Sequence, residues 1–331
     1  MIKICVKSGI KQLPLFANEK FSYFEAYLGV DDKPAELLNT KMKLISVHLP
    51  NVVRTNGKLM STNFNPASPA VEASKQKLNE ILKFSIANDV ENIILHLGFF
   101  NSFCEDGRQV IDEIARHFET LACDKVKICI ENVPCWMNLA FENESLCADK
   151  ENLLYFKKKF PAIGIALDID HVAINTVFQE FYQKYRDRYL LISDKTVLYK
   201  EMEKEIIEVT SGNVEYYSTL LNDSIDESLR VVDPTVVHAT GSDFCQYQFF
   251  EALPLRGESL PMGFSGKISG QEVCDRLNHA RWIKRFVEKD KQAAITMELS
   301  LREEYDYIEQ LNINKEYLNE MINIETKKAC R

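Results

Sequence analysis

Short apolar runs alternate along this chain with longer stretches in which apolar residues recur at helical spacing. The runs cover residues 2–6, 21–28, 43–48, 92–96, 127–131, 163–168 and 234–238, and an eighth ends at residue 298. Continuous apolar runs of this length are typical of parallel strands buried on both faces. Helical spacing predicts helices near residues 71–86 and 110–121. Eight strands alternating with helices predict an α/β fold, a single (β/α)8 TIM barrel over residues 1–331.

One connection between the predicted strands is much longer than the others. The segment at about residues 173–232, between the sixth and seventh strands, is rich in helix formers and carries six of the thirteen tyrosines. Long insertions between barrel elements are commonly functional. We therefore expect this segment to pack as helices, either over the barrel mouth or at a subunit contact. In the second case the protein would be a homo-oligomer. The chain length suits one large core and does not require a second domain.

Residues that can bind metals or transfer protons stand where six of the predicted strands end. They are His48, His96, Glu131, Asp168, His238 and Glu298. Together with His171, this places four of the six histidines of the chain at strand ends. Eight strand ends cover about 5% of the chain, so chance would place roughly 0.3 histidines there. Any single member can be a cap or a buried structural residue, but the set indicates a site at the carboxyl ends of the strands.

The stretch from Ile163 to Val172 carries two of these residues close together. In a straight strand, Asp168 and His171 would point to opposite faces, because side chains alternate. If the strand ends at Asp168 and the chain turns, the imidazole curls back and both side chains converge on one volume. The pattern therefore predicts a turn directly after Asp168.

Four of the strand-end residues predict a metal site. One comes from each of strands five to eight, which are neighbours in a closed barrel: Glu131, Asp168, His238 and Glu298. Three carboxylates and one imidazole suit Mn2+, Mg2+, Co2+ or Zn2+, and the lack of a thiolate in the set argues against a structural zinc. His48 and His96 end strands three and four, one step around the rim. They can bind a second metal bridged by Glu131, or hydrogen-bond a substrate.

Composition and charge narrow the partners and the compartment. The net charge is −9, and no run of lysines or arginines occurs, which argues against a nucleic-acid partner. The nine cysteines are scattered without a CxxC pair, which predicts reduced thiols and a cytoplasmic protein. The chain enters a strand pattern at residue 2, so we expect no signal peptide. No apolar run approaches the roughly 20 residues of a membrane helix, so we expect no membrane partner.

The order of these motifs resembles that of a known superfamily. Along the predicted strands the chain reads H-x-P, H-x-G, E-N, D-x-x-H, H and E, which is similar to the xylose-isomerase-like TIM barrels. The likeness covers nearly the whole chain apart from the segment at about 173–232. That superfamily includes sugar and sugar phosphate isomerases and epimerases, and it also includes endonuclease IV.

The resemblance implies a divalent-metal-dependent sugar or sugar phosphate isomerase or epimerase of carbohydrate metabolism. It implies metal ligation by the four residues on strands five to eight, with Glu131 and Glu298 facing the substrate from opposite sides and His171 touching it. The chemistry agrees, because a divalent ion can serve as a Lewis acid while flanking carboxylates remove and return a proton through an enediolate. The expected partner is a small polyhydroxy substrate.

Other functions on the same barrel stay open. Endonuclease IV-like phosphodiesterases resemble this chain in their histidines at the positions of His48 and His96, but they also need a third metal, which is held partly by an Asp-x-His element after strand seven. Here G-E-S-L-P-M-G places Ser259 where that histidine would stand, and no histidine lies between His238 and His279. An iron-dependent oxidative enzyme is another alternative, in which the strand-end histidines would bind iron. A barrel that only binds a ligand would have no need of four metal ligands.

Overall fold

The computed structural model of the chain describes residues 2–17, 19–134, 143–148, 150–193, 195–239, 279–288, 293–299 and 306–329. Its internal contacts divide the chain into two compact units. The first unit comprises Met1–Asp168, Val232–Val237 and Gln292–Thr296, and the second comprises Ile169–Val231, His238–Lys291 and Met297–Arg331.

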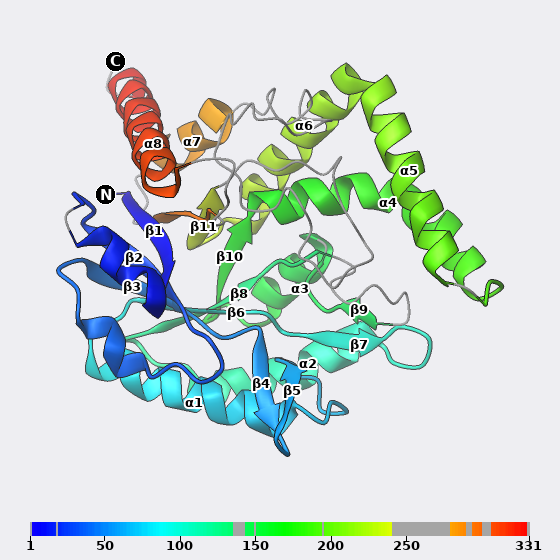
Figure 1. The fold of residues 1–331 in the computed structure, drawn as a ribbon, viewed down its shortest axis with the longest axis horizontal. Coiled ribbons are helices and arrows are strands. Elements are labelled where there is room, and N and C mark those ends of the chain that lie inside the picture. Colours follow the sequence, from blue (N-terminus) through cyan, green and yellow to red (C-terminus); the bar gives the residue numbers. More distant parts are fainter. Residues whose placement is uncertain are drawn as a thin grey trace. The chain divides into compact units, whose positions relative to one another are not determined.

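Eight parallel strands close into a barrel, as the sequence predicts (Figure 1). In the order in which they pair around the barrel, the strands are β1 (Lys3–Gly9), β12 (Ala294–Met297), β11 (Val236–Ala239), β10 (Gly164–Asp168), β8 (Lys127–Glu131), β6 (Asn92–Leu95), β3 (Lys43–His48) and β2 (Tyr23–Tyr27). Chain order and barrel order agree, which is the topology of a (β/α)8 TIM barrel.

The barrel is filled by one residue from each strand. Seven are buried apolar residues or cysteines, and Tyr23 of β2 packs against them; the seven are Cys5, Ile45, Ile94, Cys129, Ala166, Val236 and Ala294. Because side chains alternate along a strand, these residues identify which positions of each strand face the interior. This apolar layer is the floor on which the functional residues stand.

The first unit also contains helices and two short antiparallel ribbons. The helices are η1 (Ile10–Phe16), η2 (Pro34–Leu38), α1 (Val71–Ala87), α2 (Gly107–Leu121) and α3 (Lys150–Lys159). β4 (Val52–Thr55) and β5 (Lys58–Ser61) form a hairpin beside α1, and β7 (Phe99–Asn101) pairs with β9 (Asn143–Ser145) (Figure 1). The hairpin turn is Asn56-Gly57, with φ of 50° and 76°, as a tight turn matched to strand twist requires.

Between β10 and β11, the residues that the structure describes are helical apart from short turns. It forms α4 (Ile169–Tyr189), α5 (Lys195–Gly212) and α6 (Val214–Val232), and later helices are α7 (His279–Glu288) and α8 (Tyr307–Ala329). Tyrosines help to join these helices: the Tyr185 hydroxyl donates to Glu205 at 2.5 Å, and burial together with that bond raises the pKa of Tyr185. The expected role of residues 173–232 as a lid or subunit contact stays a prediction.

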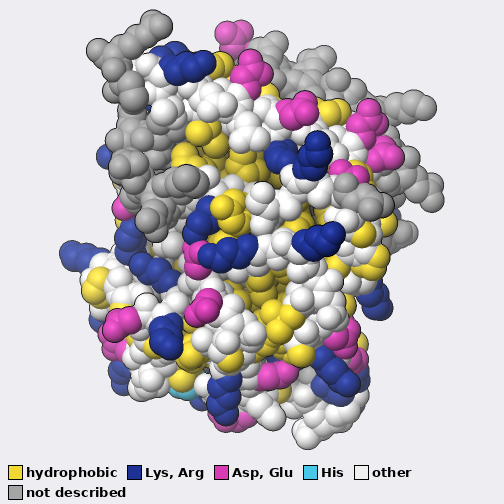
Figure 2. Space-filling view, turned by 90° about the vertical axis from the view of Figure 1, so that its left-hand side faces the viewer, with side chains coloured by type: hydrophobic (Ala, Val, Ile, Leu, Met, Phe, Trp, Pro, Cys, Tyr) yellow, Lys and Arg dark blue, Asp and Glu magenta, His cyan; other side chains and the backbone are white. Residues whose placement is uncertain are grey.

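On one face of the molecule, the charged side chains are mixed in sign (Figure 2). On the face shown in Figure 2, Lys and Arg side chains are interspersed with Asp and Glu. The five cysteines in the described ranges, Cys5, Cys104, Cys123, Cys129 and Cys147, are free thiols. Over the same ranges, no helix is both long enough and apolar enough to cross a bilayer.

Candidate metal centre

A polar layer follows the apolar layer at the carboxyl ends of the strands. Because side chains two residues apart share a face, the inward positions directly above the apolar layer follow from the strand bounds. They are Lys7, Glu25, His96, Glu131, Asp168, His238 and Thr296. Six of these seven residues carry ionisable side chains, and active sites of TIM barrels occupy this end. The barrel interior therefore changes from apolar to ionisable side chains between one inward-facing position of each strand and the next.

His48 joins this layer through an irregularity in the β2–β3 pairing. The register shifts by one residue there, because Phe24 pairs with Leu44 whereas Glu25 pairs with Ser46. A bulge of this kind redirects the residues that follow it. Ser46 and His48 therefore face inward, and without the shift Val47 would take that place. Sequence alternation alone does not reveal the shift, so the inward direction of His48 is a structural finding.

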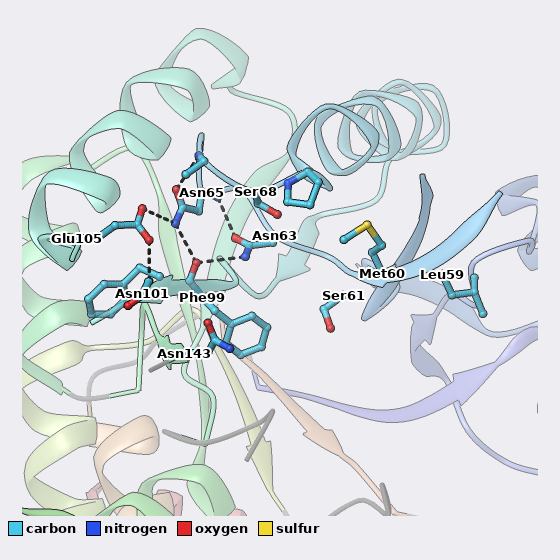
Figure 3. A pocket seen from close by; sticks show the side chains of 13 residues that line it. Leu59, Met60, Ser61, Asn63, Asn65, Ser68, Phe99, Asn101, Glu105 and Asn143 are labelled. Carbon is cyan, nitrogen blue, oxygen red and sulfur yellow. Dashed lines mark hydrogen bonds between the residues drawn. The ribbon is translucent and has the colours of Figure 1, made fainter. Parts of the chain in front are cut away.

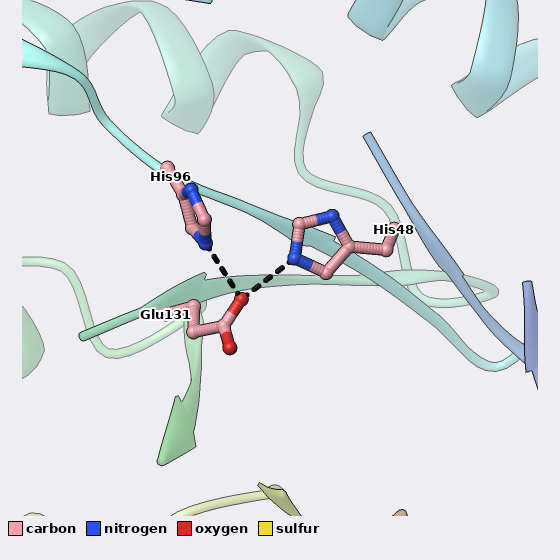
Figure 4. Close-up of side chains that lie close together, drawn as sticks. All are labelled: His48, His96 and Glu131. Atoms are coloured by element: carbon pink, nitrogen blue, oxygen red, sulfur yellow. Dashed lines mark hydrogen bonds and ion pairs between the residues drawn. The ribbon is translucent and has the colours of Figure 1, made fainter. Parts of the chain in front are cut away.

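His48, His96 and Glu131 meet at one point inside the first unit (Figure 4). Glu131 Oε2 lies 2.7 Å from His48 Nε2 and 2.9 Å from His96 Nε2. The two imidazole rings are 5.1 Å apart between centroids and nearly perpendicular. Glu131 and His48 are buried, whereas His96 keeps 13% of its side chain exposed. These two nitrogens and the carboxylate lie close enough together to be three ligands of one metal ion.

The hydrogen bonding of His48 favours a cation at this centre. Its Nδ1 lies 2.7 Å from the backbone carbonyl of Leu49, which can only accept, so Nδ1 carries the proton. In a neutral imidazole, the Nε2 lone pair then points at the Glu131 carboxylate, and the two repel each other. A cation bound at Nε2 removes this repulsion. Metal-binding histidines commonly donate their other N–H to a backbone carbonyl in this way, so the residues fit a divalent metal.

Asp168 is held in place by Asn132, the second residue of the E-N motif. The Asn132 amide donates to the Asp168 carbonyl at 2.9 Å and accepts from the Asp168 N–H at 2.7 Å. Both residues are buried, so these bonds form without competition from water. Asn132 thereby links the ends of β8 and β10. The sequence motif contained this residue, but its partner is evident only from the structure.

His238 and Glu298 form a second pair. His238 Nδ1 lies 3.0 Å from Glu298 Oε2, His238 is fully buried, and Glu298 follows β12 directly. In the barrel order, β8, β10, β11 and β12 are consecutive, so the four predicted metal ligands end four neighbouring strands. His171 is buried in the first turn of α4, which starts immediately after Asp168. The strand therefore ends at Asp168, and the chain continues directly into the helix that carries His171.

Two further residues of the polar layer were not singled out by the strand-end pattern. Glu25 is fully buried on β2, where its carboxylate lies 3.9 Å from Lys7 Nζ and accepts from the Thr296 hydroxyl at 3.1 Å. Lys7 Nζ also lies 5.9 Å from the centre of the Tyr27 ring. Both could have been identified from the sequence by their position, because each lies two residues after a member of the apolar layer. Ser259, which bears on the nuclease alternative, lies outside the described residues.

Gly98, the last residue of the H-x-G motif, has a steric role beside this centre. Its φ is +98°, and a Cβ built there would lie 2.7 Å from the Cα of Asn63. The Gly98 carbonyl accepts from Leu146 N, and the adjacent Leu97 carbonyl accepts from Phe64 N. Three loops thus cross closely just after His96, which only glycine permits.

Comparisons with known proteins agree on the architecture. No protein-family model and no curated protein sequence matches this chain. Among solved structures, a D-tagatose 3-epimerase-like protein is 17% identical, with a TM-score of 0.54 over 98% of this chain and 99% of the other. A family 2 AP endonuclease from Brucella melitensis is 11% identical, with a TM-score of 0.55 over 96% and 99%.

A third similar structure is described by its fold. It is a xylose isomerase-like TIM barrel protein from Mycobacterium smegmatis in complex with magnesium, 8% identical, with a TM-score of 0.53 over 96% of this chain and 89% of that one. At these identities, the likeness concerns the fold rather than a shared activity. The full-length coverage agrees with the closed eight-stranded barrel and its chain order. The chain has the fold of the xylose-isomerase-like TIM barrels.

Proposed function

We propose that this protein is a divalent-metal-dependent isomerase or epimerase that moves a proton beside the carbonyl of a small polyhydroxy compound. The observation that carries the proposal is the polar layer of the barrel. Four consecutive strands, β8, β10, β11 and β12, end in three carboxylates and one imidazole. This donor set suits Mn2+, Mg2+, Co2+ or Zn2+.

In this proposal Glu131, Asp168, His238 and Glu298 hold the ion. When bound, a divalent ion supplies Lewis-acid polarisation of a carbonyl or hydroxyl oxygen. Asn132 keeps the Asp168 backbone in place through its two hydrogen bonds. His48 and His96 orient Glu131 by contacting one of its two oxygens, Oε2. We assign the other oxygen, Oε1, to the ion and the substrate.

Proton transfer is assigned to the two glutamates at the ends of this strand series. Glu131 ends β8 and Glu298 follows β12, and these strands are three steps apart around the barrel. Carboxylates that approach from different directions can serve two faces of one carbon, or two neighbouring carbons. One removes a proton to form an enediolate and the other returns it. His171, buried at the start of α4, is proposed to hydrogen-bond a substrate hydroxyl.

The test is incorporation of solvent deuterium into ketoses and ketose phosphates, with Mn2+ or Co2+ present. Glu131→Gln and Glu298→Gln keep an oxygen for the ion but lose the base, so exchange should fall by about 10²–10⁴-fold. Glu113→Gln on the exposed side of α2 is the matched control and should exchange as the wild type does. Wild-type exchange rates retained by both active-site variants would contradict the assignment of the bases.

A second candidate is favoured by the His48–His96–Glu131 group. It offers ligands for a second ion, which a metal phosphodiesterase would use. Two histidines with one carboxylate also suit a non-haem iron. The AP endonuclease among the structural neighbours has the same fold. Counting and identifying the ions in protein purified without chelator separates these functions. Iron would favour oxidative chemistry, and cleavage of abasic-site DNA by the same preparation would replace the isomerase proposal with the nuclease.

A further inference from the structure

Two adjoining pockets lie beside His96 in the first unit. The inner pocket has a volume of about 130 Å³ and is lined by His96, Gly98, Phe99, Ser61, Thr62 and Asn51, among others. The outer pocket has a volume of about 370 Å³ and lies between the β4–β5 hairpin and the β7–β9 ribbon. Ser61 and Phe99 line both pockets, so the two are neighbours. Only the outer one reaches the range of about 300–1,000 Å³ that is usual for ligand sites.

Amides, hydroxyls and one carboxylate make up about half of the lining of the outer pocket, and apolar residues make up the rest (Figure 3). Its frame is internally hydrogen-bonded: Asn65 Nδ2 donates to the Phe99 carbonyl at 3.1 Å and to Glu105 Oε1 at 3.0 Å, and Asn63 Nδ2 donates to the same carbonyl at 3.1 Å. The amide N–H groups of Asn65 are thereby used within the frame. Glu105 Oε2 accepts from the Asn101 N–H at 2.7 Å. The pocket is therefore pre-formed rather than dependent on a ligand.

The carboxylate in this frame has acceptor capacity left for a ligand. An ionised carboxylate can accept about four hydrogen bonds, and the Glu105 oxygens receive two from the frame. The lining of the two pockets, as far as the structure describes it, contains no lysine or arginine. A phosphate offers only acceptors and negative charge, so Glu105 would repel it. A sugar ring offers hydroxyl donors without charge, and the Phe99 ring beside Asn143 gives its C–H face an apolar contact (Figure 3).

We infer that the outer pocket is a subsite for an uncharged, hydroxyl-rich extension of the substrate, such as a second sugar ring. The reacting ketose end would lie on the Glu131 side of His96, since Glu131 Oε2 is 2.9 Å from His96 Nε2, and the extension would lie against Glu105, Phe99 and Asn143. This inference rests on the proposed function and makes it more specific. It selects a neutral glycosylated ketose over a sugar phosphate.

Direct binding of defined probes to the full-length, Mn2+-loaded protein tests the subsite without requiring turnover. The probes are fructose, its neutral glycosides isomaltulose and lactulose, and fructose 6-phosphate, with affinities measured by calorimetry. We expect at least one glycoside to bind about tenfold more tightly than fructose, and the phosphate to bind no more tightly than fructose. Equal affinity of fructose and both glycosides, or tighter binding of the phosphate, would overturn the inference.

Substitutions in the outer pocket test whether a preference for glycosides over fructose arises there. Ser61→Trp should fill the junction of the pockets, and Glu105→Gln should remove its charge, so both should lower glycoside affinity while leaving fructose affinity unchanged or nearly so. Lys58→Trp, on the exposed part of the same strand, and Glu113→Gln are the matched controls. A glycoside preference that survives Ser61→Trp would also overturn the inference. Deuterium exchange into the same sugars, measured in parallel, distinguishes the subsite from the proposed proton transfer. If a glycoside preference is found without exchange, only the proton transfer is refuted.

Discussion

Replacing Gly98 by alanine should damage both the fold and the metal centre. The new Cβ would lie 2.5 Å from Cγ and 2.7 Å from Cα of Asn63, which is closer than real Cβ contacts allow. Asn63 cannot easily withdraw, since its amide donates to the Phe99 carbonyl and accepts from the Asn65 N–H. The loop after β5 or the loop after His96 must therefore shift.

The magnitude follows from two costs. A left-handed backbone costs an alanine about 1–2 kcal/mol, and overpacking costs about 1–3 kcal/mol more, so the free energy of unfolding should fall by roughly 2–5 kcal/mol. Gly57 provides the control, because its φ is +76° but a Cβ there would meet nothing within 4 Å. Gly57→Ala should therefore show the backbone cost alone, about 1–2 kcal/mol.

Urea unfolding followed by circular dichroism measures this difference, and metal analysis of the same preparations measures its effect on the site. Gly98→Ala should be the less stable variant and should hold less metal, because the displaced loop begins at His96. Gly57→Ala should keep its metal, as its turn lies at the far end of the hairpin from Ser61. If Gly98→Ala is as stable as Gly57→Ala, the close approach to Asn63 has no energetic consequence and the reasoning fails.

Three further predictions concern the metal centre and the helices. Asn132→Ala removes two buried hydrogen bonds to the Asp168 backbone, so it should cost about 2–5 kcal/mol of unfolding free energy and lower the metal content; full metal content at unchanged stability would refute this. Chelation with EDTA should lower the melting temperature and Mn2+ should restore it, because an ion that binds only the native state stabilises that state; a melting temperature insensitive to both would argue against a metal centre. The hydrogen bond from Arg285 lowers the pKa of Asp226, so the stabilisation from this pair is complete above the unfolded pKa of about 3.9 and is lost as the pH falls through the folded value. The stability difference between wild type and Asp226→Asn should accordingly shrink between pH 7 and pH 3, and a constant difference would contradict the assignment.

The barrel could be predicted from the chain because its strands carry a local signal. A parallel strand covered on both faces must be apolar nearly throughout, and such runs are visible without any long-range information. The runs at 43–48 and 127–131 coincide with β3 and β8. The strand-end positions of His48, His96, Glu131 and Asp168 could be read in the same way, because a polar residue that ends an apolar run marks where the strand leaves the core.

Other features depend on pairings between segments distant in the sequence. The inward direction of His48 results from a register shift between β2 and β3, which no alternation within β3 reveals. Asn132 meets Asp168 across 36 residues, and Glu25 meets Thr296 across 271 residues, where the last strand of the barrel closes near the first two. The outer pocket likewise needs the β4–β5 hairpin and the β7–β9 ribbon to be brought face to face. The sequence alone therefore determined which residues could reach the barrel mouth, because burial imposes a local pattern. The tertiary structure decided which of them meet, because strand register and barrel closure are set by contacts that no local pattern records.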